Sequence, residues 1–127
     1  MNEPIPGHKL SLIIAGGRDY KFTPEDRARL DRIPKREIVH GGAKGADAEG
    51  ANYAAIHNLP VKEFPAHWHL HGPRAGPMRN QQMAEYADAV ALFPGGKGTA
   101  SMRREARKAG IMIYDFTGQD DCQQTLI

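Results

Sequence analysis

The 127-residue chain has little of what marks disulfide-bonded or membrane-spanning proteins. Its one cysteine, Cys122, has no second cysteine to pair with inside the chain, so the composition fits a reducing compartment. No apolar run approaches the roughly 20 residues that a membrane-spanning helix needs. The segment Met1–His8 lacks the apolar stretch of a signal peptide. We therefore expect a cytoplasmic protein with no membrane partner.

The chain also has little excess of one charge over the other and few aromatic side chains. The chain has 17 basic and 15 acidic residues, and aromatic residues make up 7% of it. Proteins that coat nucleic acid normally carry a stronger basic excess, and single strands are held by exposed aromatics, so the composition argues against a nucleic-acid partner. The length suffices for one hydrophobic core and not for two. We expect a single domain over residues 1–127, with its core at about 9–116 and loose ends.

Apolar runs alternate with helix-like segments along the chain. Five apolar runs are predicted strands: Leu10–Ala15, 37–40, 61–64, 89–93 and 111–116. Helices are predicted between them: 23–32, 46–57, one that starts at Arg79-Asn80 and ends near 87, and 99–109. Compact apolar runs are typical of buried parallel strands. The alternation therefore predicts an α/β fold, with a mainly parallel sheet of about five strands and helices on both faces.

The predicted helices carry two further expectations. Thr23-Pro24-Glu25-Asp26 indicates a helix start, with Thr23 as the N-cap, proline in the first turn and acids against the helix dipole. Helical spacing directs a second group of side chains toward the core: Met83, Tyr86, Ala87, Met102, Ala106 and Ala109.

Glycine-rich turns follow three of the predicted strands. They are Gly16-Gly17, Gly41-Gly42-Ala43-Lys44-Gly45 and Pro94-Gly95-Gly96-Lys97-Gly98-Thr99. Right-handed crossovers place all three at one edge of the sheet, where α/β proteins bind ligands at the point at which strand order reverses. A glycine turn that opens a helix presents bare amides to a phosphate. Each turn alone could be only a tight connection, but three on one edge favour a site for a phosphate-bearing ligand.

Side chains near these turns are candidates for contact with the ligand. Arg79 can bind phosphate or ribose through its guanidinium, the alternative being a surface ion pair. Asp47 can bind ribose hydroxyls or act as a base, or it only caps its helix. These two are the candidate catalytic residues. Arg18 and Asp19 either close the pocket or pair with each other. The predicted ligand-binding set is Gly16, Gly17, Arg18, Asp19, Gly41, Gly42, Ala43, Gly45, Asp47, Arg79, Asn80, Gly95, Gly96, Gly98 and Thr99.

A segment from Pro65 to Pro77 is predicted to be a loop and contains His67, His69 and His71. In an extended loop these alternate histidines would point to one side, as metal ligands do. No cysteine or acid accompanies them at ligand spacing, so surface or loop packing is favoured, and we predict no metal and no cofactor. Trp68 is expected to anchor the loop rather than to stack on a base.

Two common nucleotide motifs are missing. The second turn lacks the Gly-Lys-Ser/Thr end of a Walker A loop, and no Gly-x-Gly-x-x-Gly follows the first strand. Taken together, the motifs resemble the SLOG superfamily, named for the Smf/DprA and LOG proteins, and most closely its YspA/YpsA-like branch. The resemblance covers about Lys9 to Phe116. It rests on Ala15-Gly16-Gly17-Arg18-Asp19, His40 through Asp47, Phe64-Pro65-Ala66 with Trp68, Ala75 through Asn80, and Phe93 through Thr99.

The resemblance implies a Rossmann-like, three-layer domain. Its glycine loops would hold a nucleotide or nucleotide-derived ligand, of the nucleoside phosphate or ADP-ribose type, as sensor or enzyme. LOG relatives cleave the N-glycosidic bond of nucleoside monophosphates with an arginine, which Arg79 matches, and a glutamate just past Pro-Gly-Gly-x-Gly-Thr. Here Ala100, Ser101 and Met102 follow Thr99, so that glutamate is missing, and Asp47 and Asp19 are the acids left at this edge.

Three functions therefore stay open from the sequence: a ligand-binding domain, an N-glycosidase, and a DprA-like module that binds single-stranded nucleic acid. The resemblance also implies a homodimer.

Overall fold

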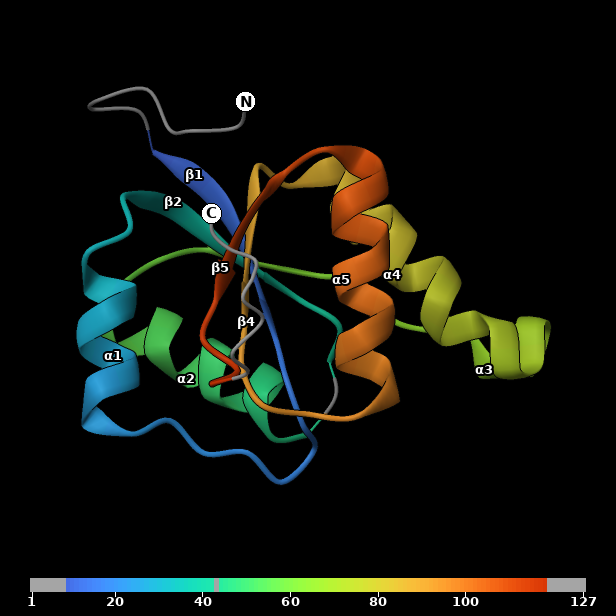
Figure 1. Ribbon diagram of the computed structural model, residues 1–127, viewed down its shortest axis with the longest axis horizontal. Coiled ribbons are helices and arrows are strands. Elements are labelled where there is room, and N and C mark those ends of the chain that lie inside the picture. The colour runs from blue at the N-terminus through green and yellow to red at the C-terminus, as the bar shows by residue number, and fades with distance from the viewer. Residues whose placement is uncertain (1–8, 43, 119–127) are drawn as a thin grey trace.

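The computed structural model describes residues 9–42 and 44–118 (Figure 1). The expectations for the two ends of the chain, for Ala43 and for Cys122 lie outside the described residues. The strands are β1 (Leu10–Ala15), β2 (Lys35–His40), β3 (Val61–Glu63), β4 (Ala89–Leu92) and β5 (Met112–Asp115). They form one five-stranded sheet in the order β3-β2-β1-β4-β5, and every neighbouring pair is parallel. The predicted α/β class with a parallel sheet is confirmed.

Helices cover both faces of this sheet. Helices α1 (Pro24–Asp31) and α2 (Ala46–Ile56) lie on one face, and α4 (Ala75–Tyr86) and α5 (Lys97–Ala109) lie on the other (Figure 1). Successive strand residues point to opposite faces, so Ile14 packs toward α1 and α2 while Ile13 packs toward α4 and α5. Both isoleucines are fully buried. The result is the expected three-layer, Rossmann-like domain.

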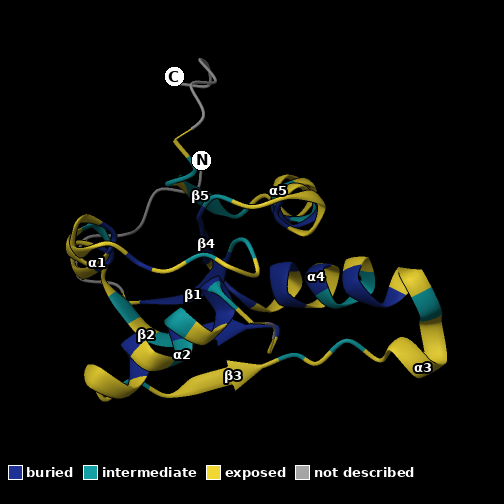
Figure 2. Ribbon diagram, turned by 90° about the horizontal axis from the view of Figure 1, so that it is seen from below, coloured by how far each residue is buried: buried dark blue, intermediate teal, exposed yellow. Residues whose placement is uncertain are grey.

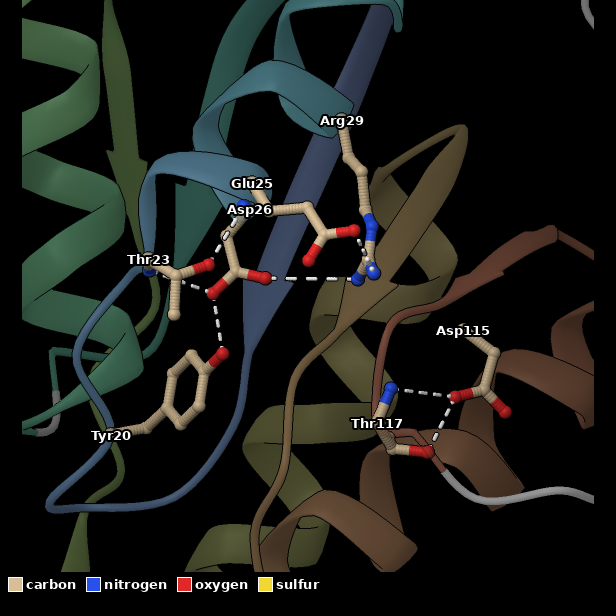
Figure 3. A network of polar contacts seen from close by, with 7 residues as sticks. All are labelled: Tyr20, Thr23, Glu25, Asp26, Arg29, Asp115 and Thr117. Carbon is tan, nitrogen blue, oxygen red and sulfur yellow. Dashed lines mark hydrogen bonds and ion pairs between the residues drawn. The ribbon is translucent and has the colours of Figure 1, made fainter.

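Helix α1 begins as its sequence predicts, with Thr23 as its N-cap (Figure 3). Pro24 is in the first turn. The Oγ1 atom of Thr23 accepts a hydrogen bond from the Asp26 amide at 3.0 Å, and Oδ2 of Asp26 accepts one from the Thr23 amide at 3.0 Å. The Tyr20 hydroxyl donates to the same carboxylate. This reciprocal pair is a capping box, which satisfies two amides that the helix itself cannot.

The segment from Pro65 to Pro77 is wrongly predicted as a loop. It contains the short helix α3 (Trp68–His71), then a 3-10 turn, η1 (Gly72–Arg74), and the first turn of α4. Pro73 and Pro77 lie in first turns, where the missing N–H would have no partner within the helix, so neither breaks the structure. Figure 2 shows α3 projecting from the body with its residues exposed. Arg79 and Asn80 consequently lie in the second turn of α4, not at its start.

Three smaller predictions are also wrong. Helix α5 begins at Lys97 rather than Thr99, because Gly96 is its N-cap. Tyr86 is 45% exposed, since its ring lies at the edge of the core beside Phe64, at 5.4 Å between centroids. Ala109 is exposed: after Gly110, which has left-handed backbone, Ile111 packs against the core in its place.

The ends of the other elements differ from the predicted ones by a few residues. Within residues 9–42 and 44–118, no helix has both the length and the apolar character that crossing a bilayer requires.

Candidate functional site

Three glycine turns converge at Gly17. Its amide donates to the Pro94 carbonyl at 2.7 Å, which joins the turn after β1 to the turn after β4. Its carbonyl accepts from the Ala46 amide at 3.0 Å, which joins the same turn to the first residue of α2. Strand order reverses between β1 and β4, so this junction is the topological switch point of the sheet. All three turns lie at the carboxyl edge, the lower edge of the sheet in Figure 1.

Several of the predicted glycines are needed to pack these turns together. A Cβ on Gly16 would lie 2.7 Å from the Cβ of Ala46 and 2.9 Å from that of Phe93. Gly45 has a φ of +74° and lies against the backbone of Gly17 and Arg18. A Cβ on Gly95 would lie 2.6 Å from the Gly17 amide nitrogen. At these positions the close packing of the turns, and at Gly45 also the positive φ, is enough to explain glycine.

Gly96 and Gly98 are different. Apart from adjacent residues and the backbone of α5 itself, no atom of the described residues lies within 4 Å of the position that a Cβ would occupy on either. Both residues are exposed. Gly96 is the N-cap of α5, no side chain caps that helix, and its first turn contains no acid. The first amides of α5 have no partner within the helix. This 13-residue helix therefore begins at the switch point with N–H groups that no side chain caps, and with Lys97 beside them.

Thr99 lies in the first turn of α5 and is 6% exposed. Its Oγ1 atom is buried and has no hydrogen-bond partner among the described residues. The hydroxyl lies against Gly95, where a Cβ would collide with it. The N-cap of α5 is Gly96, so Thr99 does not cap the helix. Buried hydroxyls usually have a partner, so this one marks a donor that is available directly beneath the glycine turn.

Arg79 and Asp47 hold the turn after β2 from two sides. Oδ2 of Asp47 accepts from the Gly41 amide at 3.0 Å, and Nη1 of Arg79 donates to the Gly41 carbonyl at 2.7 Å. Nε of Arg79 donates to Oδ1 of Asn80 at 2.9 Å. Burial lowers the pKa of Arg79, while the Asp47 carboxylate opposes that shift. Both candidate catalytic residues are thus engaged with the backbone of Gly41, and a Cβ there would collide with the guanidinium.

Asn80 joins α4 to the start of α5. It is 5% exposed, and its Nδ2 donates to Oγ of Ser101 at 3.1 Å. Ser101 was not predicted as a site residue, because only the packing of the two helices brings it to Asn80. Arg18 and Asp19 are both exposed, and within the described part of the chain they form no ion pair with each other.

The three histidines do not lie on an extended strand. His69 and His71 belong to α3, and His67 immediately precedes it. Over the described ranges, no group of three or more His, Cys, Asp or Glu side chains is placed to hold a metal ion. Trp68 is 58% exposed, and its ring contacts α4 at Gly76.

Sequence reasoning missed two polar residues at the ends of β2 and β3. Nδ1 of His40 accepts from the Gly42 amide at 2.9 Å. The carboxylate of Glu63 lies against Gly42, whose φ is +79°. Their positions at the carboxyl ends of predicted strands were the available signal, since these ends share the edge that holds the glycine turns.

The chain is similar to proteins in one described family. Residues 11–71 match the sequence model of a family described as "YspA, cpYpsA-related SLOG family" and abbreviated YAcAr. A Mycobacterium phage D29 protein named "Gene 61 protein" is 39% identical over 87 residues, which cover 62% of this chain and 70% of that protein. No solved structure matches the chain significantly. With these similarities and its three-layer sheet, the chain belongs to the YspA, cpYpsA-related SLOG family.

Proposed function

We propose that this protein binds a nucleotide or nucleotide-derived ligand, of the nucleoside phosphate or ADP-ribose type, with a phosphate at the N-terminus of α5. The observation that carries the proposal is the open helix start, where no side chain caps α5 and the Cβ positions of Gly96 and Gly98 meet no neighbour among the described residues. No contact within the described part of the chain explains glycine at these two positions. A ligand that must approach the backbone closely does explain it.

The chemistry of the helix start favours an anion. The amides and the helix dipole attract negative charge, and Lys97 adds a cation. The Thr99 hydroxyl beneath the turn supplies a further donor that lacks a partner in the described chain. Phosphate oxygens accept hydrogen bonds from donors of both kinds.

The geometry favours binding over glycosidic cleavage. Arg79 and Asp47 are both hydrogen-bonded to Gly41, and Met102, beyond Thr99, is 1% exposed in the core. No carboxylate follows Thr99 in the first turns of α5 to stabilise an oxocarbenium-like sugar. These contacts therefore support a ligand-binding domain rather than an N-glycosidase. The near-balanced charge and the few aromatic residues argue against a DprA-like nucleic-acid module.

A thermal-shift experiment tests the proposal. Purified protein is heated with AMP, ADP-ribose, cyclic AMP or inorganic phosphate, because a ligand that binds only the native state raises the unfolding midpoint. We expect at least one nucleotide to raise the midpoint more than inorganic phosphate does. If none of the nucleotides raises it, the proposal is wrong.

The Gly98→Ala variant separates ligand binding from fold stability. Alanine is the better helix former, so the unliganded variant should be more stable by up to about 1 kcal/mol. Its methyl group would enter the open space before the amides, so the nucleotide-induced shift should shrink. Arg104→Ala, an exposed change farther along the same helix, is the matched control and should keep the full shift. A full shift in Gly98→Ala would contradict the assigned position of the phosphate.

A further inference from the structure

His40 and Glu63 lie side by side at the carboxyl ends of β2 and β3. They are register partners in the parallel ladder, so their side chains leave the same face of the sheet. This is the edge that also holds the open start of α5, because all strands are parallel. With neighbouring strands 4.7–4.9 Å apart, the end of β2 lies two spacings, or about 10 Å, from the end of β4.

The contacts of these two side chains leave hydrogen-bonding groups unused. His40 is 7% exposed. Its Nδ1 atom accepts a hydrogen bond from the Gly42 amide, so the proton of the ring lies on Nε2. Within residues 9–42 and 44–118, neither the Nε2 atom of His40 nor the Glu63 carboxylate has a hydrogen-bond or ion-pair partner. A Cβ at position 42 would collide with the Glu63 carboxylate, so glycine there makes room for it.

A carboxylate beside an imidazole N–H complements a pair of neighbouring hydroxyl groups. The two hydroxyls would donate to the carboxylate oxygens, and one hydroxyl oxygen would accept from Nε2. In dinucleotide-binding α/β folds, an acid about 20 residues past the glycine turn binds the ribose hydroxyls. Here β2 ends at His40, the glycines Gly41 and Gly42 follow it without an acid, and Glu63 brings a carboxylate to this place from β3.

We propose that Glu63, assisted by His40, binds the vicinal hydroxyls of the ligand's ribose and makes the site selective for ribonucleotides. The inference rests on the proposed function, since it places the sugar of the same ligand whose phosphate lies at α5. Glu63 and His40 are specificity-determining residues, and the Asp47–Gly41–Arg79 contacts fix the turn beside them.

Calorimetric titration with AMP, ADP-ribose and dideoxy-AMP, which lacks both ribose hydroxyls, tests this inference. We expect the wild-type protein to bind AMP about tenfold or more tighter than dideoxy-AMP, because hydrogen bonds to a charged group are lost. Glu63→Gln should weaken the binding of AMP and ADP-ribose by a similar factor and leave dideoxy-AMP unchanged. Glu85→Gln, an exposed change on α4, is the control and should alter none of the three.

The second variant, His40→Asn, retains an acceptor for the Gly42 amide but removes Nε2, and should also lower the preference for AMP over dideoxy-AMP. Equal binding of AMP and dideoxy-AMP by the wild type would overturn the inference while leaving the proposed function intact. So would an undiminished preference in Glu63→Gln. If the wild type binds none of the three nucleotides, the proposed function is wrong and the inference with it.

Discussion

Thr99 combines deep burial with an unpartnered hydroxyl. A hydroxyl buried without a hydrogen bond costs about 1–3 kcal/mol, and such groups in folded proteins call for a specific explanation. The location of Thr99 beneath the Gly95 turn, in the first turn of an uncapped helix, connects this cost with the proposed ligand site.

Replacing Thr99 with valine should change stability and binding in opposite directions. Valine keeps the shape and removes the unsatisfied oxygen, so the free energy of unfolding should rise by about 1 kcal/mol. The nucleotide-induced shift should fall because a donor is lost. Chemical denaturation measures the first effect and the thermal-shift assay the second. Thr99→Ser keeps the hydroxyl and should retain most of the shift. A clear loss of stability in Thr99→Val would mean that the hydroxyl has a partner in the unliganded protein.

The motifs of the candidate site could be predicted from the sequence, but the contacts of the individual residues could not. Gly16 and Gly96 look alike in the sequence. In the folded chain, however, Gly16 packs against Ala46 and Phe93, where a Cβ would collide. A Cβ on Gly96 would meet no neighbour among the described residues. The hydrogen bond that Arg79 donates could not be predicted either, because its acceptor, the Gly41 carbonyl, is distant in the sequence.

At the level of the element, α1 shows how much a local pattern can specify. Its capping box involves Thr23 and Asp26, three residues apart, and needs no distant partner (Figure 3). Helix α3 was missed because Gly72, Pro73 and Pro77 together are typical of a loop. Prolines in first turns are compatible with helices, and contacts with α4 decide between the two structures.

The cap of α1 should contribute more stability than its surface ion pair. Thr23→Ala removes an acceptor for the Asp26 amide and should lower the free energy of unfolding by about 1 kcal/mol. Glu25→Gln breaks the 3.2 Å ion pair with Arg29, but the Glu25 side chain is 74% exposed, so only a few tenths of a kcal/mol are expected. Urea denaturation of both variants gives the comparison. An equal or larger effect of Glu25→Gln would contradict this ranking.

For the whole molecule, the layer architecture followed from the alternation of apolar runs and helices, but the strand order did not. The order β3-β2-β1-β4-β5 depends on the chain crossing to the other face after β3, and the sequence carries no local mark of that crossing. This crossing brings the ends of β1 and β4 together, and the hydrogen bond from Gly17 to Pro94 follows from it. The location of the candidate site is thus a property of the topology.

Stability at alkaline pH is also a property of the whole molecule, because all four tyrosines have raised pKa values. Burial, then the hydrogen bond to Asp26, raises the pKa of Tyr20 to about 12. Burial also raises the pKa of Tyr53 and Tyr114, and the hydrogen bond to Glu37 raises that of Tyr86.

A raised pKa in the folded state stabilises the protein fully below the unfolded value, near 10, and this stabilisation is lost as the pH rises through the folded value. The unfolding midpoint should therefore fall above about pH 10. In Tyr20→Phe the fall of the unfolding midpoint with pH should be shallower, because one tyrosine whose ionisation favours unfolding has been removed. Phenolate absorbance and circular dichroism, recorded together, check this. Tyrosines that all ionise near their unfolded value, while the circular dichroism stays native, would refute the argument.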